Sequence, residues 1–113
     1  MPSGDKFYYM TPARVVSQVI RPAPFVLYLV LFDTAQSAAI EYAQLFDRDD
    51  LPDPGDAPLV SIKLFKDGFA YYQPSEGERL FSDGFTVGLS TTGDDYTAAA
   101  VANLLVMVEG REP

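Results

Sequence analysis

The segment DRDDLPDPGD, residues 47–56, places five aspartates and two prolines within ten residues. Clustered carboxylates can bind calcium, and the best-known calcium loop has the pattern D-x-[DN]-x-[DN]-G followed by a distal Glu. Asp47 and Asp49 match the first two positions, but Leu51 stands at the third and Pro52 stands where the glycine is needed. The segment therefore does not match the calcium loop.

Two interpretations of the acidic segment stay open on the sequence. In the first, a calcium site of another geometry uses the carboxylates of Asp47, Asp49, Asp50 and Asp56. In the second, the segment is a solvated connection between strands, in which Pro and Gly shape the turn and water screens the like charges. We expect the solvated connection, and no bound metal.

The rest of the chain offers few groups for catalysis. It has no cysteine and no histidine, which excludes disulfides, thiolate nucleophiles and imidazole ligands and removes the commonest general base. Asp94 and Asp95 are sequence neighbours, whereas a glycosidase places its two carboxyl groups on opposite sides of a cleft. There is no G-x-S-x-G motif and no glycine-rich phosphate loop. The sequence predicts a protein that is not an enzyme and that needs no cofactor.

The charge balance argues against two classes of partner. Sixteen acidic and eight basic residues give a net charge of −8, whereas proteins that bind nucleic acid present clustered Lys and Arg to the phosphates. The basic residues are scattered, so no basic stripe faces anionic lipid either. The start of the chain lacks the apolar core of a secretory signal, and the longest apolar runs are shorter than the ~20 residues that span a bilayer. We expect neither nucleic acid nor a membrane as partner.

The length of the chain and the spacing of its prolines and glycines predict the fold. A chain of 113 residues fits one domain, which we place at residues 1–113. Prolines and glycines divide the sequence into short apolar segments, a pattern that favours strands over long helices. The predicted strands are residues 14–20, 25–33, 40–46, 59–65, 69–73, 79–89 and 101–109. We expect an all-β fold, a single antiparallel β-sandwich of about seven short strands with an extended N-terminal arm at residues 1–13.

Two segments carry a helical alternative. Residues 35–46 place apolar residues at helical spacing, and residues 95–109 offer an aspartate N-cap before an alanine run. We prefer strand for both segments. In the second, the branched residues of LLVMV suit a strand that is covered on both sides.

The dipeptide Asp-Gly at residues 67–68 predicts a hairpin, because a two-residue type I′ turn needs positive φ at both positions. In that register Leu64 faces Tyr71, and Lys63 faces Tyr72 on the other side. We therefore expect Tyr71 to point into the core and Tyr72 to point outward.

The segment FVLYLVLF, residues 25–32, is apolar on both faces. Simple alternation places Phe25 and Leu27 on one face and Val30 and Phe32 on the other. A strand of this kind is either covered on both sides or exposes one side to another subunit. A loop, the N-terminal arm and a second subunit are all candidates for the cover.

The aromatic residues suggest where such a contact forms, since exposed tyrosines can anchor protein interfaces or stack on sugars. We expect an interface built from the N-terminal arm, the two-faced strand and one outward tyrosine. The candidate interface residues are Phe7, Tyr8, Tyr9, Phe25, Tyr28, Phe32 and Tyr72.

Two stretches resemble a known module. The segments YAQLFDRDDLPDPGDAPLVSIKL and RLFSDGFTVGLSTT, followed by a final apolar strand, are similar to a small β-sandwich module that recurs among structural proteins of tailed bacteriophages. In that module a strand ends in an aspartate before a Leu-Pro and Gly-x-x-Pro turn, and a later Phe-Ser-x-Gly strand closes on Ser-Thr. The matching positions are Asp47, Leu51, Pro52, Gly55, Pro58, Phe81, Ser82, Gly84, Ser90 and Thr91.

The resemblance covers residues 42–92 and implies a role in a virion. It implies a noncatalytic subunit that decorates or cements the capsid, assembled in the host cytoplasm, with capsid or tail proteins as partners and with the subunit itself forming a homo-oligomer. A tail or head-to-tail connector position is the alternative within the virion. The sequence departs from the module in the paired acids Asp49 and Asp50 and in its added N-terminal segment. The competing class is a glycan-binding adhesion module that uses outward tyrosines such as Tyr72.

Overall fold

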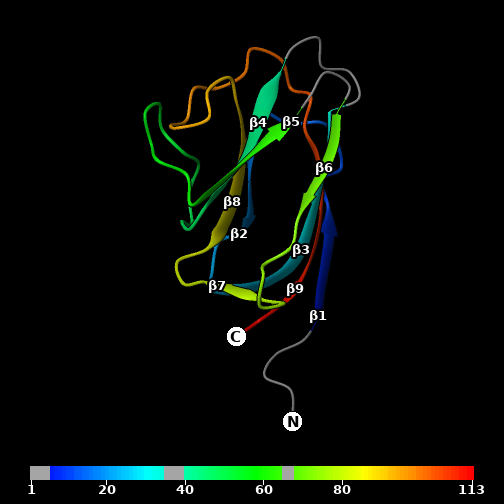
Figure 1. Ribbon diagram of the computed structural model, residues 1–113. Helices are drawn as coiled ribbons and strands as arrows, with labels where there is room; N and C mark the ends of the chain where they lie inside the picture. Colours follow the sequence, from blue (N-terminus) through cyan, green and yellow to red (C-terminus); the bar gives the residue numbers. More distant parts are fainter. Residues whose placement is uncertain (1–5, 35–39, 65–67) are drawn as a thin grey trace.

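Residues 6–34, 40–64 and 68–113 are described by the computed structural model, and they form two antiparallel sheets packed face to face (Figure 1). These residues contain nine strands and no helix, which confirms the predicted all-β sandwich. The segments with a helical alternative are strand or loop, with residues 35–39 outside the described part. Among the described residues there is accordingly no helix that could cross a membrane.

The two sheets share the strands almost evenly. The strands of the first sheet are β1 (Lys6–Met10), β9 (Leu105–Arg111), β3 (Phe25–Thr34) and β6 (Gly68–Tyr72), in that order, with the short β7 (Arg79–Phe81) paired to the beginning of β3. Those of the second sheet are β2 (Ser17–Arg21), β8 (Phe85–Ser90), β4 (Glu41–Phe46) and β5 (Val60–Leu64), in that order. Neighbours along the chain often lie in opposite sheets, so most contacts join distant parts of the sequence.

The core lies between the sheets and is built around aromatic rings. Phe25 of β3 stacks on Phe85 of β8 with ring centroids 5.5 Å apart, and Phe81 of β7 meets Phe85 edge to face at 4.9 Å. All three side chains are fully buried. Aromatic pairs of this kind add about 0.5–1.5 kcal/mol to the free energy gained from burial. The rings therefore join the two sheets at one end of the sandwich.

Strand β3 contains a bulge at Tyr28. Leu27 pairs with Gly110 of β9 and Leu29 pairs with Glu109, so Tyr28 is an extra residue on β3. A bulge of one residue reverses the alternation of the side chains that follow it. Before the bulge the odd-numbered residues of β3 point to the core, and after it the even-numbered residues do.

The bulge corrects the faces expected for β3. Phe25 and Leu27 point into the core before the bulge, and Val30 and Phe32 point into it afterwards, all four with 0% exposure. Simple alternation put these two pairs on opposite faces. The bulge brings both pairs to the inner side of the sheet and leaves Leu29 and Leu31 on its outer side.

The predicted hairpin is wrong, because β5 and β6 belong to different sheets. Leu64 pairs within the second sheet, whereas Tyr71 pairs with Leu31 of β3 in the first. Tyr71 is exposed and Tyr72 packs against the core, the reverse of the expected orientation. Asp67 of the predicted turn lies outside the described residues.

The predicted strand at residues 79–89 divides into β7 and β8, which lie in different sheets. The chain turns between them at Gly84, which has a φ of 155°. A Cβ atom at this position would lie 2.7 Å from the carbonyl oxygen of Arg48 and 2.8 Å from that of Arg21. Because the two carbonyls leave no space for a side chain, the turn requires glycine.

The second sheet is covered on its outer side by the connection at residues 91–104, which is hydrogen-bonded to the connection at residues 47–59 (Figure 1). Tyr96 of the first connection meets Phe46 of β4 edge to face, with ring centroids 5.8 Å apart. The fully buried Gln44 donates from Nε2 to two backbone carbonyls of the same connection, at 2.9 and 3.1 Å. These contacts bury outward-pointing side chains of β4.

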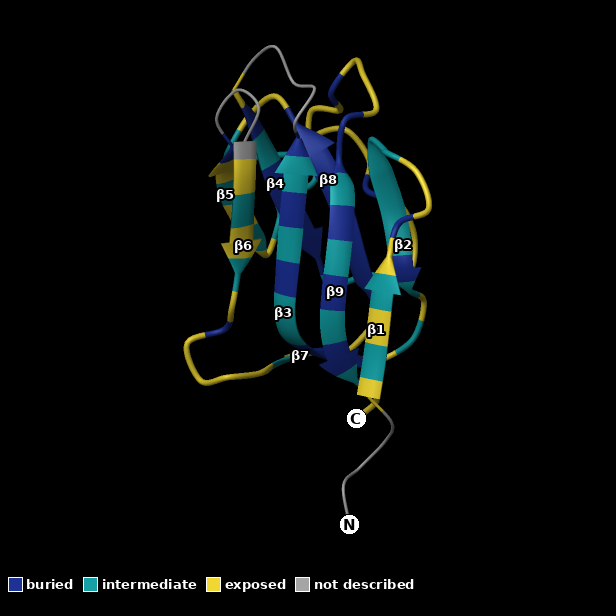
Figure 2. Cartoon of the chain, turned by 90° about the vertical axis from the view of Figure 1, so that its right-hand side faces the viewer, coloured by how far each residue is buried: buried dark blue, intermediate teal, exposed yellow. Residues whose placement is uncertain are grey.

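The first sheet has no such cover within the described part of the chain. In Figure 2 the strands β6, β3, β9 and β1 face the viewer, and no described segment crosses them. Residues 6–10 of the expected arm form β1, which extends the sheet at its edge beside β9. These residues of the arm therefore do not shield the outer side of β3, and no other described residue covers that side.

Candidate functional site

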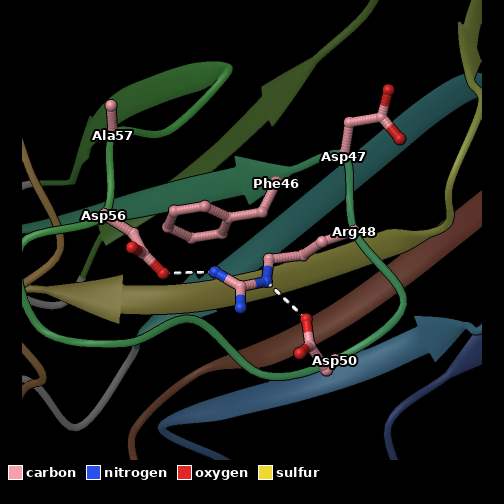
Figure 3. A pocket seen from close by; sticks show the side chains of 6 residues that line it. All are labelled: Phe46, Asp47, Arg48, Asp50, Asp56 and Ala57. Carbon is pink, nitrogen blue, oxygen red and sulfur yellow. Dashed lines mark hydrogen bonds and ion pairs between the residues drawn. The ribbon is translucent and has the colours of Figure 1, made fainter.

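The acidic segment surrounds one cation, Arg48 (Figure 3). Arg48 Nε donates a hydrogen bond to Asp50 Oδ1 at 2.6 Å, and its guanidinium also donates to Asp56 Oδ2. Asp53 forms a further ion pair with the guanidinium at 3.9 Å. Arg48, Asp50 and Asp56 line a depression of about 370 Å³. Three of the five aspartates therefore balance the charge of an arginine in their own segment.

Asp47 points away from this cluster (Figure 3). Its carboxylate accepts hydrogen bonds from the backbone N–H groups of Ser82 and Asp83, at 3.2 and 2.8 Å, and from the Ser82 hydroxyl at 3.2 Å. Ser82 and Asp83 form the turn between β7 and β8. Asp47 therefore ties the end of β4 to a turn that is distant in sequence.

The contacts keep two of the carboxyl groups ionised. The hydrogen bond from Arg48 lowers the pKa of Asp50. The pKa of Asp56 is lowered first by the backbone N–H of Asp53 and then by Arg48. In return, the hydrogen bond to Asp50 is the main reason why the pKa of Arg48 is raised.

This arrangement favours the solvated connection over the calcium site. A calcium ion would compete with a guanidinium that is already placed among the carboxylates. The carboxylate of Asp47 is directed to another part of the surface. In the described ranges, no cluster of three or more acidic side chains is arranged to hold a metal.

A second candidate site is the open outer side of the first sheet. Residues that are direct cross-strand partners point to the same face of a sheet. Met10 pairs with Met107, Met107 with Leu31, and Leu31 with Tyr71, so one row of apolar side chains crosses all four strands. Met10 is 57% exposed and Tyr71 is 61% exposed. The row therefore presents thioether and aromatic groups to solvent from one edge to the other.

Two parallel rows widen this surface. On one side, Tyr8 pairs with Glu109 and Glu109 with Leu29. On the other side, Leu105 pairs with Asp33 and Asp33 with Phe69. We call the apolar residues of the three rows the apolar face. They are Tyr8, Met10, Leu29, Leu31, Phe69, Tyr71, Leu105 and Met107.

The apolar face is hollowed near its centre. A depression of about 170 Å³ is lined by side chains of the rows, among them Tyr8, Leu31 and Met107. Its wall also includes Glu109, an acidic residue within the apolar surroundings. The other acid in the rows, Asp33, forms an ion pair with Arg14 at 3.6 Å. The face thus combines a large apolar area with little net charge.

The structure separates the predicted interface residues into three groups, which are buried, exposed and half-buried. Phe25 and Phe32 are fully buried in the core of the chain itself, so their side chains are not available to another subunit. Tyr8 lies on the apolar face, 66% exposed. The remaining four are half-buried.

Three of the half-buried residues have partners within the chain. Phe7 packs edge to face on Phe25 with ring centroids 5.3 Å apart. The Tyr9 hydroxyl accepts a hydrogen bond from Gln18 Nε2 at 3.3 Å. The Tyr72 hydroxyl accepts one from Arg79 at 3.1 Å, so Tyr72 is not the outward tyrosine that we expected.

Sequence reasoning missed most of the apolar face, although one signal was present. The β9 segment LVMVEGR is apolar on both faces over its first four residues, like the β3 segment. Two such strands in one small domain indicate neighbours in the middle of a sheet with an open outer side. That β1 pairs with β9 and β6 with β3 could not be predicted from the sequences of these strands.

Comparisons of the chain with protein-family models, with curated proteins and with solved structures find no match. The class of the protein therefore follows from the fold and the surface alone. It is a two-sheet β-sandwich with one outer side covered by its own connections and the other apolar and open.

Proposed function

We propose that this protein is a noncatalytic structural subunit that binds a neighbouring protein chain through the apolar face. The observation that supports this most directly is the row of Met10, Met107, Leu31 and Tyr71, which crosses the whole sheet with its ends exposed. Monomeric proteins rarely expose contiguous apolar patches larger than a few hundred Å², and larger patches mark interaction sites. Methionine and tyrosine are also enriched at interfaces between proteins.

The specific role that we propose is decoration or cementing of a tailed-phage capsid. Support comes from the resemblance over residues 42–92, in which the matching residues serve the scaffold. Asp47 and Ser82 are joined by hydrogen bonds, and Gly84 allows the adjacent crossing of the chain. These contacts make the sandwich rigid, whereas the residues on its surface determine what the protein binds. A tail or head-to-tail connector would use the same surface and is the second position in the virion.

The geometry favours a protein partner over a glycan. Sugar sites combine an aromatic ring with several convergent polar groups. The exposed ring of Tyr71 lies beside Leu31, and the ring of Tyr8 lies beside the single carboxylate of Glu109 with Met10 on the same face, so several convergent polar groups are not present at either ring among the described residues. Tyr72 is half-buried and its hydroxyl is engaged by Arg79.

The test is to band virus-like particles by density from cells that encode the chain and to quantify its peptides by mass spectrometry. A structural subunit should be present in a fixed ratio to the major capsid protein, and a Met107→Glu variant should be lost from the band. If the chain stays in the soluble fraction and the band contains none of it, the virion role is wrong.

A further inference from the structure

We propose that the apolar face binds a second copy of this chain, so that two first sheets pack face to face around a two-fold axis. This inference rests on the proposed function, because it names the neighbour that occupies the face.

The area is close to what a specific dimer needs. Tyr8, Phe69 and Tyr71 are each more than 60% exposed, and an aromatic side chain offers roughly 150–250 Å². Their exposed parts alone therefore supply roughly 300–450 Å². With Met10 and the half-buried residues of the rows, the face offers roughly 600 Å² per copy, against roughly 800 Å² in a standard interface. The rim around the rows can supply the difference.

The charge distribution lets two acidic chains meet at this face. Each copy carries a net charge of −8, so most of its surface repels a second copy. Within the three rows the acidic residues are Glu109 and Asp33, and Arg14 balances Asp33. Lys6 and Arg111 are cross-strand partners in the row next to Glu109, and Arg111 also forms an ion pair with Glu78. Self-association is therefore least opposed by repulsion here.

The central row is complementary to itself. A two-fold axis parallel to the strands, between β9 and β3, would place Met10 of one copy over Tyr71 of the partner copy. The same operation places Met107 over Leu31 of the partner copy. Thioether sulfur and aromatic rings attract one another, and this contact would occur twice. Sheets that pack face to face keep their strands within about 30° of parallel, which this axis respects.

Glu109 distinguishes a second copy from another kind of partner on this face. Face-to-face packing would bury its carboxylate near Leu29 of the partner copy, and an ionised group costs more to bury than an amide. Glu109→Gln should therefore strengthen the dimer. If a different partner with a basic residue occupied the face, the same substitution would weaken binding instead.

The first test is sedimentation equilibrium of the full chain from about 1 to 200 μM. The wild type should shift from the 12.4 kDa monomer to a species of twice that mass. Tyr71→Ser should weaken the dimer at least tenfold, and Glu109→Gln should tighten it several-fold. The control is Leu51→Ser, which removes an exposed leucine outside the first sheet and should leave the association unchanged. A wild type that stays monomeric at 200 μM would overturn the dimer. The proposed function would still stand or fall by the separate particle test.

The second test fixes the geometry by crosslinking. The chain has no cysteine, so a Met10→Cys, Tyr71→Cys double variant adds the only two thiols. Within one copy these positions lie three strand spacings apart, about 14 Å, too far for a disulfide. Mild oxidation should therefore give a covalent dimer of the double variant and none of either single variant.

The open edge of β1 supplies the competing arrangement. The Thr11 N–H bonds to the Val106 carbonyl, so by antiparallel alternation the backbone groups of Tyr8 point away from β9. Edge-to-edge pairing of two β1 strands would bring two copies of Tyr8 together, and Tyr8→Cys alone would then crosslink. A Tyr8→Cys dimer without crosslinking of the double variant would refute the face-to-face packing.

Discussion

The carboxylate of Asp47 holds Ser82 by two hydrogen bonds, one from its backbone N–H and one from its hydroxyl, both at 3.2 Å. The pair joins the end of β4 in the second sheet to the turn that follows β7 of the first. Because the residues are 35 positions apart in the sequence, this contact helps to set how the two sheets meet at one end.

Asp47→Ala should destabilise the fold by about 1–3 kcal/mol, since it removes three accepted hydrogen bonds from a charged group. The measurement is the urea midpoint at neutral pH. Asp49→Ala, which removes an exposed carboxylate from the same connection, is the matched control and should change stability by less than about 0.5 kcal/mol. Equal effects for the two variants would contradict a structural role for the Asp47 contacts.

Gly84→Ala should be more destabilising than a glycine substitution elsewhere at positive φ. At Gly84 the new Cβ meets the carbonyl oxygens of Arg48 and Arg21, whereas at Gly77, with φ 86°, no atom lies within 4 Å. We expect about 1 kcal/mol of lost stability for Gly77→Ala and at least about 3 kcal/mol for Gly84→Ala. Thermal and urea unfolding of both variants would measure the difference. Similar values would show that the crossing at Gly84 can relax.

Acid should weaken the fold through the cluster around Arg48. The folded pKa values of Asp50 and Asp56 are lowered, so these groups bind protons less readily in the folded than in the unfolded chain. Their contribution is fully present above the ordinary carboxyl pKa of about 4 and is lost as the pH falls through the lowered values. Arg48→Met should remove most of the part that comes from Asp50, whereas Asp56 keeps the hydrogen bond from the Asp53 N–H.

The measurement for this prediction is the urea midpoint of wild type and Arg48→Met at a series of pH values from 7 to 2. The variant should be less stable at neutral pH, where Asp50, Asp53 and Asp56 then repel one another, and the two proteins should converge in acid. Parallel curves would mean that Arg48 does not determine the protonation of its neighbours.

Deleting Tyr28 should be tolerated, because it is the extra residue of the bulge in β3. Without it, Phe25, Leu27, Val30 and Phe32 follow a regular alternation and all still point inward. Deleting Leu31 instead should prevent folding, since it turns Phe32 and the residues after it to the outer side. Circular dichroism and the dispersion of amide resonances would distinguish a folded from an unfolded chain. Failure of the Tyr28 deletion to fold would show that the bulge is required by its neighbours.

Much of the local structure follows from the sequence. The segments around β3, β4, β5 and β6 match the predicted strands to within a residue or two at each end, because branched and aromatic runs between prolines and glycines favour extended backbone. The pairing of β5 with β6 did not follow. An Asp-Gly dipeptide favours a tight turn, but it does not require the two flanking strands to exchange hydrogen bonds.

The candidate site was harder to predict than the fold. Tyr8 was identified, but the expected role of Tyr72 belongs to its neighbour Tyr71, because pairing with β3 determines which of the two faces outward. For the acidic segment the sequence favoured a solvated connection and left a calcium site open as the alternative, but it did not show where each carboxylate lies. The structure divides these carboxylates between Arg48 and the turn at Ser82, and no local pattern reveals the contact with Ser82.

By itself, the sequence determined an acidic all-β chain without cysteine or histidine, with two strands that are apolar on both sides. The tertiary structure alone decided that β3 and β9 lie next to each other, that a bulge selects the inward residues of β3, and that the described connections cover only one of the two sheets. The physical reason is that side-chain alternation is a local property with a period of two residues. Strand partners, register and cover are set by hydrogen bonds and packing between residues far apart in the chain.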